Sequence, residues 1–123
     1  MYKRQVLRIC ALATGMADKA VSLIYERVLH TERSAAWETR CQSQIRSVLA
    51  VLETDRAAGD TEWWFGPMLT HADIEVGCAL RFLRDAHPAL FDAARWPALA
   101  AHSERAEALP AFIAIRQAFR PPD

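Results

Sequence analysis

Residues 63–83 read WWFGPMLTHADIEVGCALRFL, and they predict a buried central helix. Gly66 and Pro67 interrupt the backbone just before that helix. Thr70 stands three residues ahead of Asp73, which is the spacing of a capping box: the Thr70 hydroxyl accepts from the N–H of Asp73, and the Asp73 carboxylate accepts from the N–H of Thr70. We therefore interpret this pair as structural rather than as a catalytic acid and base. The segment that follows is apolar nearly all round, as in a helix that others pack around.

Apolar residues on both sides of this stretch also recur at helical spacing. Steps of three and four residues predict a first helix from about residue 3 to 30 and a second from about residue 35 to 56. The expected core stripes are Val6, Ile9, Ala13, Met16, Ala20, Ile24 and Val28 in the first helix, and Trp37, Cys41, Ile45, Val48, Leu49 and Leu52 in the second.

Capping residues and prolines place the remaining helix ends. Ser34 suits the start of the second helix, and Gly59 suits its C-terminal end. Pro97 and Pro110 each suit the first turn of a further helix, and we expect the last one to carry Phe112, Ile115 and Phe119. No strand pattern of period two persists. We therefore expect an all-α fold: one domain over residues 1–123, built as a bundle of about five helices.

Composition excludes several classes of protein. Hydrophobic residues make up 52% of the 123 residues, and the formal net charge is zero, so nothing steers nucleic acid or an anionic membrane to the chain. The three cysteines form no Cys-x-x-Cys pair, and the four histidines lie too far apart in the sequence for a metal-site motif. We expect no metal site, no membrane span and no signal peptide, and a reducing cytoplasmic location.

The motifs together resemble the C-terminal half of a glutathione S-transferase. The resemblance is carried by Gly66, by LTHADI at residues 69–74, by WPALA at residues 96–100 and by LPAF at residues 109–112. Residues 11–18, ALATGMAD, are similar to part of the first long helix of that domain in bacterial members. The resemblance to the glutathione S-transferases implies an all-helical domain whose central helix begins at the Thr70–Asp73 pair. The family's thioredoxin-like N-terminal half, which binds glutathione and activates its thiol, is not in these 123 residues.

The same resemblance implies a candidate substrate site. In the family, the first half of the first C-terminal helix lines the electrophile pocket, and this maps to Arg8, Ala11, Leu12, Gly15 and Met16, with Cys10 nearby. Leu12 and Met16 lie one turn apart, which suits an apolar ligand wall and equally suits plain core packing. Gly15 indicates either close approach of another backbone or a tolerated glycine on an exposed face.

Aromatic and thiol side chains have structural interpretations. Trp63, Trp64 and Phe65 are adjacent, so we expect at least one to fill the core while another can remain at the surface. We interpret Cys10, Cys41 and Cys78 as small core residues.

Two functional hypotheses follow. In the first, the chain is the electrophile-binding helical domain of a glutathione S-transferase-like protein: no residue here is a catalytic nucleophile, no cofactor binds this domain alone, and a thioredoxin-like half supplies glutathione as co-substrate. The isolated chain is then inactive towards its small apolar electrophile. In the second, the chain is a non-catalytic helical interaction module. If the chain keeps the family fold, we expect an apolar face around Leu12 and Met16 to pair with a thioredoxin-like partner or with a second copy. The alternative is a stable monomer in which Arg8, Thr14 and Lys19 make this face polar.

Overall fold

The structure is a computed structural model that describes residues 3–121. It contains five α-helices and a short 3₁₀ helix, and it has no strand in the described range, where a single bridge joins Trp63 and Gly66. The expected all-α bundle is confirmed. The elements, in chain order, are α1 (Lys3–Leu29), α2 (Ala35–Ala57), α3 (His71–Ala86), η1 (Pro88–Leu90), α4 (Pro97–Glu107) and α5 (Pro110–Ile115).

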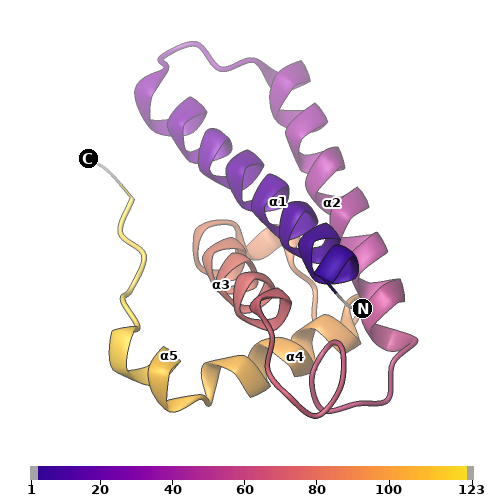
Figure 1. Cartoon of the computed structure of the whole chain (residues 1–123). Helices are drawn as coiled ribbons and strands as arrows, with labels where there is room; N and C mark the ends of the chain where they lie inside the picture. The colour runs from indigo at the N-terminus through magenta and orange to yellow at the C-terminus, as the bar shows by residue number, and fades with distance from the viewer. Residues whose placement is uncertain (1–2, 122–123) are drawn as a thin grey trace.

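The two longest helices, α1 and α2, form an antiparallel hairpin, and α3 packs against α1 (Figure 1). Helices α4 and α5 run along the other side of α3, and the segment after α5 turns back along one side of the molecule towards α1. Half of the 16 residues of α3 are buried, a larger share than in any other helix described. The central position expected for this helix is therefore confirmed.

The core stripes follow the predicted periodicity with a few differences. Ile9, Ala13, Met16, Ala20 and Ile24 are all buried on α1. On α2 the buried residues include Cys41, Ile45, Leu49 and Leu52, and Val48 is partly buried. Trp37 was expected in this stripe and is instead exposed, because it lies in the first turn of α2, beyond the region that α1 and α4 cover.

Most helix ends also match the prediction. The Ser34 hydroxyl caps α2 by accepting from the N–H of Trp37 at 3.3 Å, and prolines occupy the first turns of α4 and α5. Gly59 directly follows Ala58, the C-cap residue of α2, and its N–H donates to the Arg56 oxygen at 3.2 Å, but its backbone is not left-handed. In the described range only Gly66 has a positive φ, at 149°.

Of the two alternatives for Gly15, the structure supports the second, a tolerated glycine on an exposed helix face. Gly15 is exposed, and a Cβ added there would have no neighbour within 4 Å. Close approach occurs instead at Gly77 on α3, where an added Cβ would lie 3.0 Å from the Ala106 Cβ and 3.2 Å from the ring of Phe112. Gly77 therefore lets α4 and α5 approach the central helix.

Candidate functional site

The start of α3 is held by the predicted capping box, and both of its reciprocal contacts are present. Asp73 does more than cap the helix. One of its carboxylate oxygens, Oδ2, accepts from the N–H of Thr70 at 2.9 Å, while Oδ1 accepts from the N–H of Trp64 at 2.8 Å. Asp73 is fully buried, so this carboxylate joins the preceding loop to the central helix. The structural interpretation of the Thr70–Asp73 pair agrees with these contacts.

A buried histidine that sequence reasoning did not single out lies against this capping box. His102, on α4, has no exposed surface, and its Nε2 lies 3.2 Å from the backbone oxygen of Asp73. Its Nδ1 has no hydrogen-bond partner and lies 3.9 Å from Asp73 Oδ1. The rings of Trp63 and Trp64 contact the imidazole edge-on, with centroids 5.9 Å and 5.3 Å away. Burial lowers the pKa of His102, which favours the neutral ring.

The loop before α3 is closed by a buried arginine. Arg56 donates to the backbone oxygens of Thr61, Glu62 and Trp63 at 2.8, 3.0 and 3.3 Å. Trp63 and Trp64 are both buried, so the prediction that at least one of them fills the core is confirmed. Phe65 is half-buried and packs against the core.

The five residues predicted to line a substrate pocket lie on two faces of α1. Arg8, Ala11 and Gly15 are exposed, and Arg8 forms a loose ion pair with Asp55 at 3.8 Å. Leu12 is half-buried against the core, and Met16 is fully buried within it. The structure thus brings Arg8, Ala11 and Gly15 together at the surface, but it does not bring Met16 to that surface.

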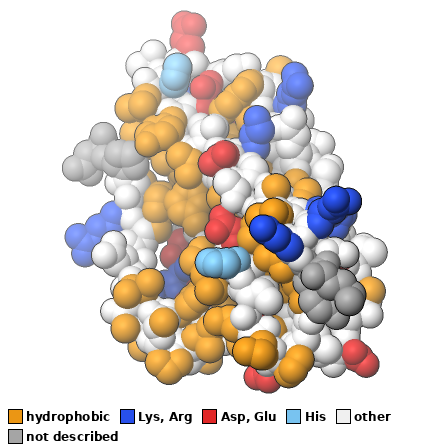
Figure 2. Space-filling view, viewed as in Figure 1, with side chains coloured by type: hydrophobic (Ala, Val, Ile, Leu, Met, Phe, Trp, Pro, Cys, Tyr) orange, Lys and Arg blue, Asp and Glu red, His pale blue; other side chains and the backbone are white. Residues whose placement is uncertain are grey.

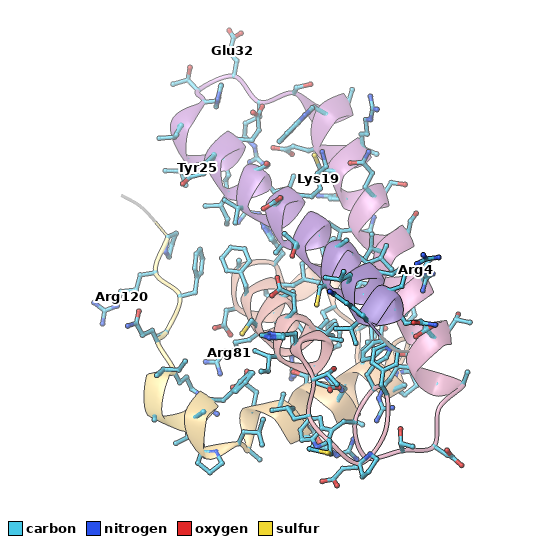
Figure 3. The ribbon with its side chains drawn as sticks, in the orientation of Figure 1. Arg4, Lys19, Tyr25, Glu32, Arg81 and Arg120 are labelled. Atoms are coloured by element: carbon cyan, nitrogen blue, oxygen red, sulfur yellow. The ribbon has the colours of Figure 1, made fainter. Side chains whose placement is uncertain are left out.

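The expected apolar face around Leu12 and Met16 therefore needs correction. The exposed large apolar residues of α1 are Leu7, Val21, Tyr25 and Leu29, which recur on one side of a 3.6-residue helix. On the same stripe, Thr14 donates to Glu75 of α3 at 2.6 Å. Figure 3 shows Tyr25 near the C-terminal end of α1, on the side where the C-terminal segment runs. The family resemblance indicated the wrong side of α1, whereas hydrophobic periodicity correctly placed Met16 in the stripe that faces the core.

A chamber that sequence reasoning missed lies between α3, α5 and residues 116–120. Its volume is about 570 Å³, and its apolar lining includes Ile74, Phe82, Phe112 and Phe119. Figure 2 shows hydrophobic side chains around a hollow on this side of the molecule. The sequence does indicate an additional apolar surface here, because α3 is apolar over a wider face than the core can cover. In the structure Ile74 and Cys78 of this helix remain exposed.

The segment after α5 forms the outer wall of this chamber. Phe119 packs edge-on against Phe82, with ring centroids 5.3 Å apart. Arg116 donates to the backbone oxygen of Glu107 at 2.7 Å and pairs with its carboxylate at 3.1 Å. The last helix ends at Ile115, which leaves Ile115 exposed and puts Phe119 on an extended segment instead of on the helix that the sequence predicted.

The three cysteines differ in their surroundings. Cys41 is buried as predicted, Cys10 is half-buried and Cys78 is exposed, so the core interpretation of Cys78 is wrong. Burial, and secondarily the nearby Glu75 carboxylate, raises the pKa of both Cys10 and Cys78 above the ordinary thiol value. Neither thiol is therefore activated as a nucleophile. Within residues 3–121 no three His, Cys, Asp or Glu side chains lie close enough to hold a metal ion, and no helix there is long and apolar enough to cross a membrane.

Comparison with known proteins identifies the family. The family model of the glutathione S-transferase C-terminal domain matches residues 35–105, which is more than half of the chain. The chain therefore belongs to the glutathione S-transferase C-terminal domain family. No curated protein matches it in sequence.

Solved structures agree with that assignment. A glutathione S-transferase from Methylobacterium radiotolerans, in complex with glutathione sulfonate, is 31% identical with a TM-score of 0.84, and the match covers 96% of this chain and 55% of that one. A glutathione S-transferase from Methylobacillus flagellatus with glutathione bound is 26% identical with a TM-score of 0.78, covering 89% and 54%. A family member from Pseudomonas fluorescens with bound S-(propanoic acid)-glutathione is 31% identical with a TM-score of 0.76, covering 98% and 58%. The chain thus spans little more than half the length of these proteins.

Proposed function

We propose that this chain is the electrophile-binding helical domain of a glutathione S-transferase-like protein, and that it needs a thioredoxin-like half for glutathione conjugation. The supporting observation is the match to about half of the glutathione S-transferase that was crystallised with glutathione sulfonate. In this proposal glutathione is the co-substrate. Its thiolate forms a C–S bond with a small apolar electrophile, and the electrophile loses its leaving group.

The exposed part of the predicted site supports a role in holding the electrophile. Ala11 and Gly15 have the smallest side chains on the exposed face of α1, and they leave space beside the half-buried Leu12. Arg8 adds a cation at one end of this surface. The thioredoxin-like half would close the pocket from the other side.

The properties of the cysteine thiols support the proposal that this chain binds the electrophile and does not supply a nucleophile. The raised pKa values of Cys10 and Cys78 leave little thiolate at neutral pH, so neither thiol supplies a nucleophile. We assign activation of the glutathione thiol to the thioredoxin-like half. Cys10, Cys41 and Cys78 are all free, which suits the reducing cytoplasm that we propose as the location.

A complementation assay tests the proposal. The chain is mixed with a separately produced polypeptide, namely the part of the Methylobacterium radiotolerans protein that the chain does not cover. The rate of glutathione conjugation to a chlorodinitrobenzene is then measured by absorbance. We expect neither polypeptide alone to exceed the uncatalysed rate, and we expect the mixture to exceed it.

Two exposed alanines give matched variants for this assay. Ala11→Trp fills the proposed substrate surface, whereas Ala50→Trp places the same ring on α2. The first should reduce the rate of the mixture, and the second should not. Catalysis by the pure chain alone would refute the need for a partner, and a complex that forms without any rate enhancement would refute the substrate-binding role.

A further inference from the structure

We propose that His87 and Arg27 form a pH-sensitive latch that holds the C-terminal turns of α1 against the end of α3. His87 directly follows α3, and its side chain is buried. Both ring nitrogens face α1: Nε2 lies 2.8 Å from the backbone oxygen of Ala20, and Nδ1 lies 3.4 Å from a guanidinium nitrogen of Arg27. Ala20 and Arg27 are about two helical turns apart. One imidazole therefore ties the last turns of α1 to the central helix, and the proposal does not depend on the proposed function.

The partners of His87 fix the protonation state of its ring. Arginine is only a donor, so the contact with Arg27 requires Nδ1 to be unprotonated and to accept. The ring proton of neutral His87 then lies on Nε2, which donates to the Ala20 oxygen. This tautomer satisfies both nitrogens at once, so the latch is closed when His87 is neutral.

Protonation of His87 is incompatible with this arrangement. A proton on Nδ1 would face an N–H of Arg27, so two donors and two positive charges would meet at 3.4 Å beside a buried ring. Burial lowers the pKa of His87, the hydrogen bond to the Ala20 oxygen raises it, and the Arg27 cation lowers it. The resulting pKa is below the ordinary histidine value of 6.5, so the ring is neutral at neutral pH and takes up a proton in acid.

A second partner for Arg27 lies on α2. The hydrogen bond from Arg33 is the main cause that lowers the pKa of Glu38, and the Arg27 cation contributes to the same lowering. Arg27 is therefore within electrostatic reach of the Glu38 carboxylate as well as of His87. Because the pKa of Glu38 is below the ordinary value of 4.5, this carboxylate stays ionised at the pH where His87 becomes charged. We expect Arg27 then to leave the ring and move towards Glu38, which opens the latch and frees the last turns of α1.

The other charged side chains near the latch have partners of their own, and η1 carries no charged residue. The pairs are Arg84 with Ser103, Asp85 with Arg81, and Glu26 with the N–H of Ser34. His30 is exposed and lies 3.9 Å from the Glu26 carboxylate, so protonation of His30 strengthens that pair. Acid thus acts in opposite directions through His30 and His87, and variants of the two histidines separate these effects.

Nitrogen NMR of the unchanged chain tests the closed latch. Spectra that correlate the ring protons of His87 with its two nitrogens distinguish the tautomers. At about pH 7.5 we expect the neutral tautomer with its proton on Nε2, because Arg27 can only donate to Nδ1. A proton on Nδ1 at this pH would overturn the proposal.

Removing the charge of Arg27 tests the pairing. Arg27→Gln keeps a donor on this side chain and removes the cation, so His87 should take up its proton at a higher pH. Arg46→Gln, at an exposed position on α2, should leave the His87 titration unchanged. NMR titration of the His87 ring measures both variants. No shift for Arg27→Gln, or an equal shift for the two variants, would overturn the proposal.

Hydrogen exchange measures the opening of the latch, and protection factors correct for the intrinsic dependence of exchange on pH. We expect the protection factors of the amides of residues 24–29 to fall by at least about threefold between about pH 7.5 and pH 5, because these turns lose their tie to α3. The fall should disappear in His87→Gln, whose amide can donate to the Ala20 oxygen but does not titrate, and should persist in His30→Gln. Constant protection in the unchanged chain, or an equal fall in the two variants, would overturn the proposal.

Discussion

At the scale of single residues, two helical glycines show how packing decides the effect of one methyl group. Gly15 and Gly77 both lie inside helices, where alanine is favoured by roughly 0.5–1 kcal/mol. A Cβ at Gly15 meets nothing within 4 Å, but a Cβ at Gly77 lies 3.0 Å from the Ala106 Cβ. That Ala106 atom is fixed to the backbone of α4 and cannot rotate away.

We therefore predict opposite outcomes for the same substitution. Gly15→Ala should raise the free energy of unfolding by about 0.5–1 kcal/mol through helix propensity alone. The free energy of unfolding of Gly77→Ala should be lower than that of Gly15→Ala by at least about 1 kcal/mol, because overpacking against α4 cancels the gain in helix propensity. Urea unfolding of both variants measures the difference. Equal stabilisation by the two substitutions would mean that α4 and α5 are not in close contact with α3.

A second prediction at this scale concerns acid. Burial lowers the pKa of His102 and of His87, so the folded chain takes up fewer protons than the unfolded chain below the ordinary histidine value of 6.5. The groups that act on His102 besides burial are Asp73, which raises its pKa, and Arg56 and Arg105, which lower it. The contribution of both histidines to stability is therefore complete above about pH 6.5 and decreases as the pH falls below it.

We expect the free energy of unfolding to decrease between about pH 7.5 and pH 5, and His102→Gln to make this decrease shallower. The measurement is urea unfolding at several pH values, and the readout is the slope rather than the stability at any one pH. His71→Gln, at an exposed position on α3, is the matched control. If the free energy of unfolding decreases as steeply with falling pH in His102→Gln as in His71→Gln, the prediction is wrong.

At the scale of helices, the start of α3 depends unequally on the two residues of its capping box. The sequence predicts similar losses for Thr70→Ala and Asp73→Ala, of around 1 kcal/mol each. The structure predicts a larger loss of stability for Asp73→Ala, because the Asp73 carboxylate is buried and also accepts a hydrogen bond from the N–H of Trp64. Removing it leaves a buried donor without a partner.

We predict that Thr70→Ala costs about 1 kcal/mol and Asp73→Ala about 2–3 kcal/mol. The double variant should cost less than the sum, since both residues act on the same helix start. Unfolding midpoints of the three variants provide the test, with Ser34→Ala at the α2 cap as a comparison. Equal losses for the two single variants would show that the link to Trp64 adds nothing.

Contacts between helices that are distant in sequence also set helix ends. Glu53 of α2 accepts from the N–H groups of Ala98 and Leu99 at 2.8 and 2.9 Å, and so caps α4. The residue before α4 is Trp96, which supplies no side-chain cap of its own. A helix start can thus be completed by a carboxylate 45 residues away.

At the scale of the whole molecule, the exposed apolar stripe of α1 has a consequence for assembly. Leu7, Val21, Tyr25 and Leu29 lie on one side of the helix, and single domains seldom leave large apolar patches uncovered. The formal net charge of zero provides no general repulsion between copies. We propose this stripe as the face that a thioredoxin-like half would cover.

Without such a partner, we predict that the chain self-associates through that stripe. Light scattering across a concentration series should show a rising average mass. Replacing Leu7 and Tyr25 together by Lys should reduce the average mass to that of the monomer, because charges are costly to bury. Val51→Lys, at an exposed apolar position on α2, is the control. A monomer at all concentrations, or equal effects of the two changes, would exclude this stripe as an interface.

The sequence by itself determined the helical class, the family and most helix boundaries. Periodicity, the Thr70–Asp73 spacing and the prolines at 97 and 110 are local signals, and local backbone preferences are enough to produce what they predict. The buried position of α3 followed from its composition for the same reason.

Only the tertiary structure decided what lies between helices. It placed His102 against Asp73 and Phe119 edge-on against Phe82, and it decided for core packing at Met16, one of two alternatives that the sequence left open. It also exposed Cys78, although its neighbours in sequence are buried. These features depend on which helix covers which face, and that depends on the summed packing of residues far apart in the chain. No local spacing carries that information, because the same apolar residue suits either a core or a ligand wall until its neighbours are in place.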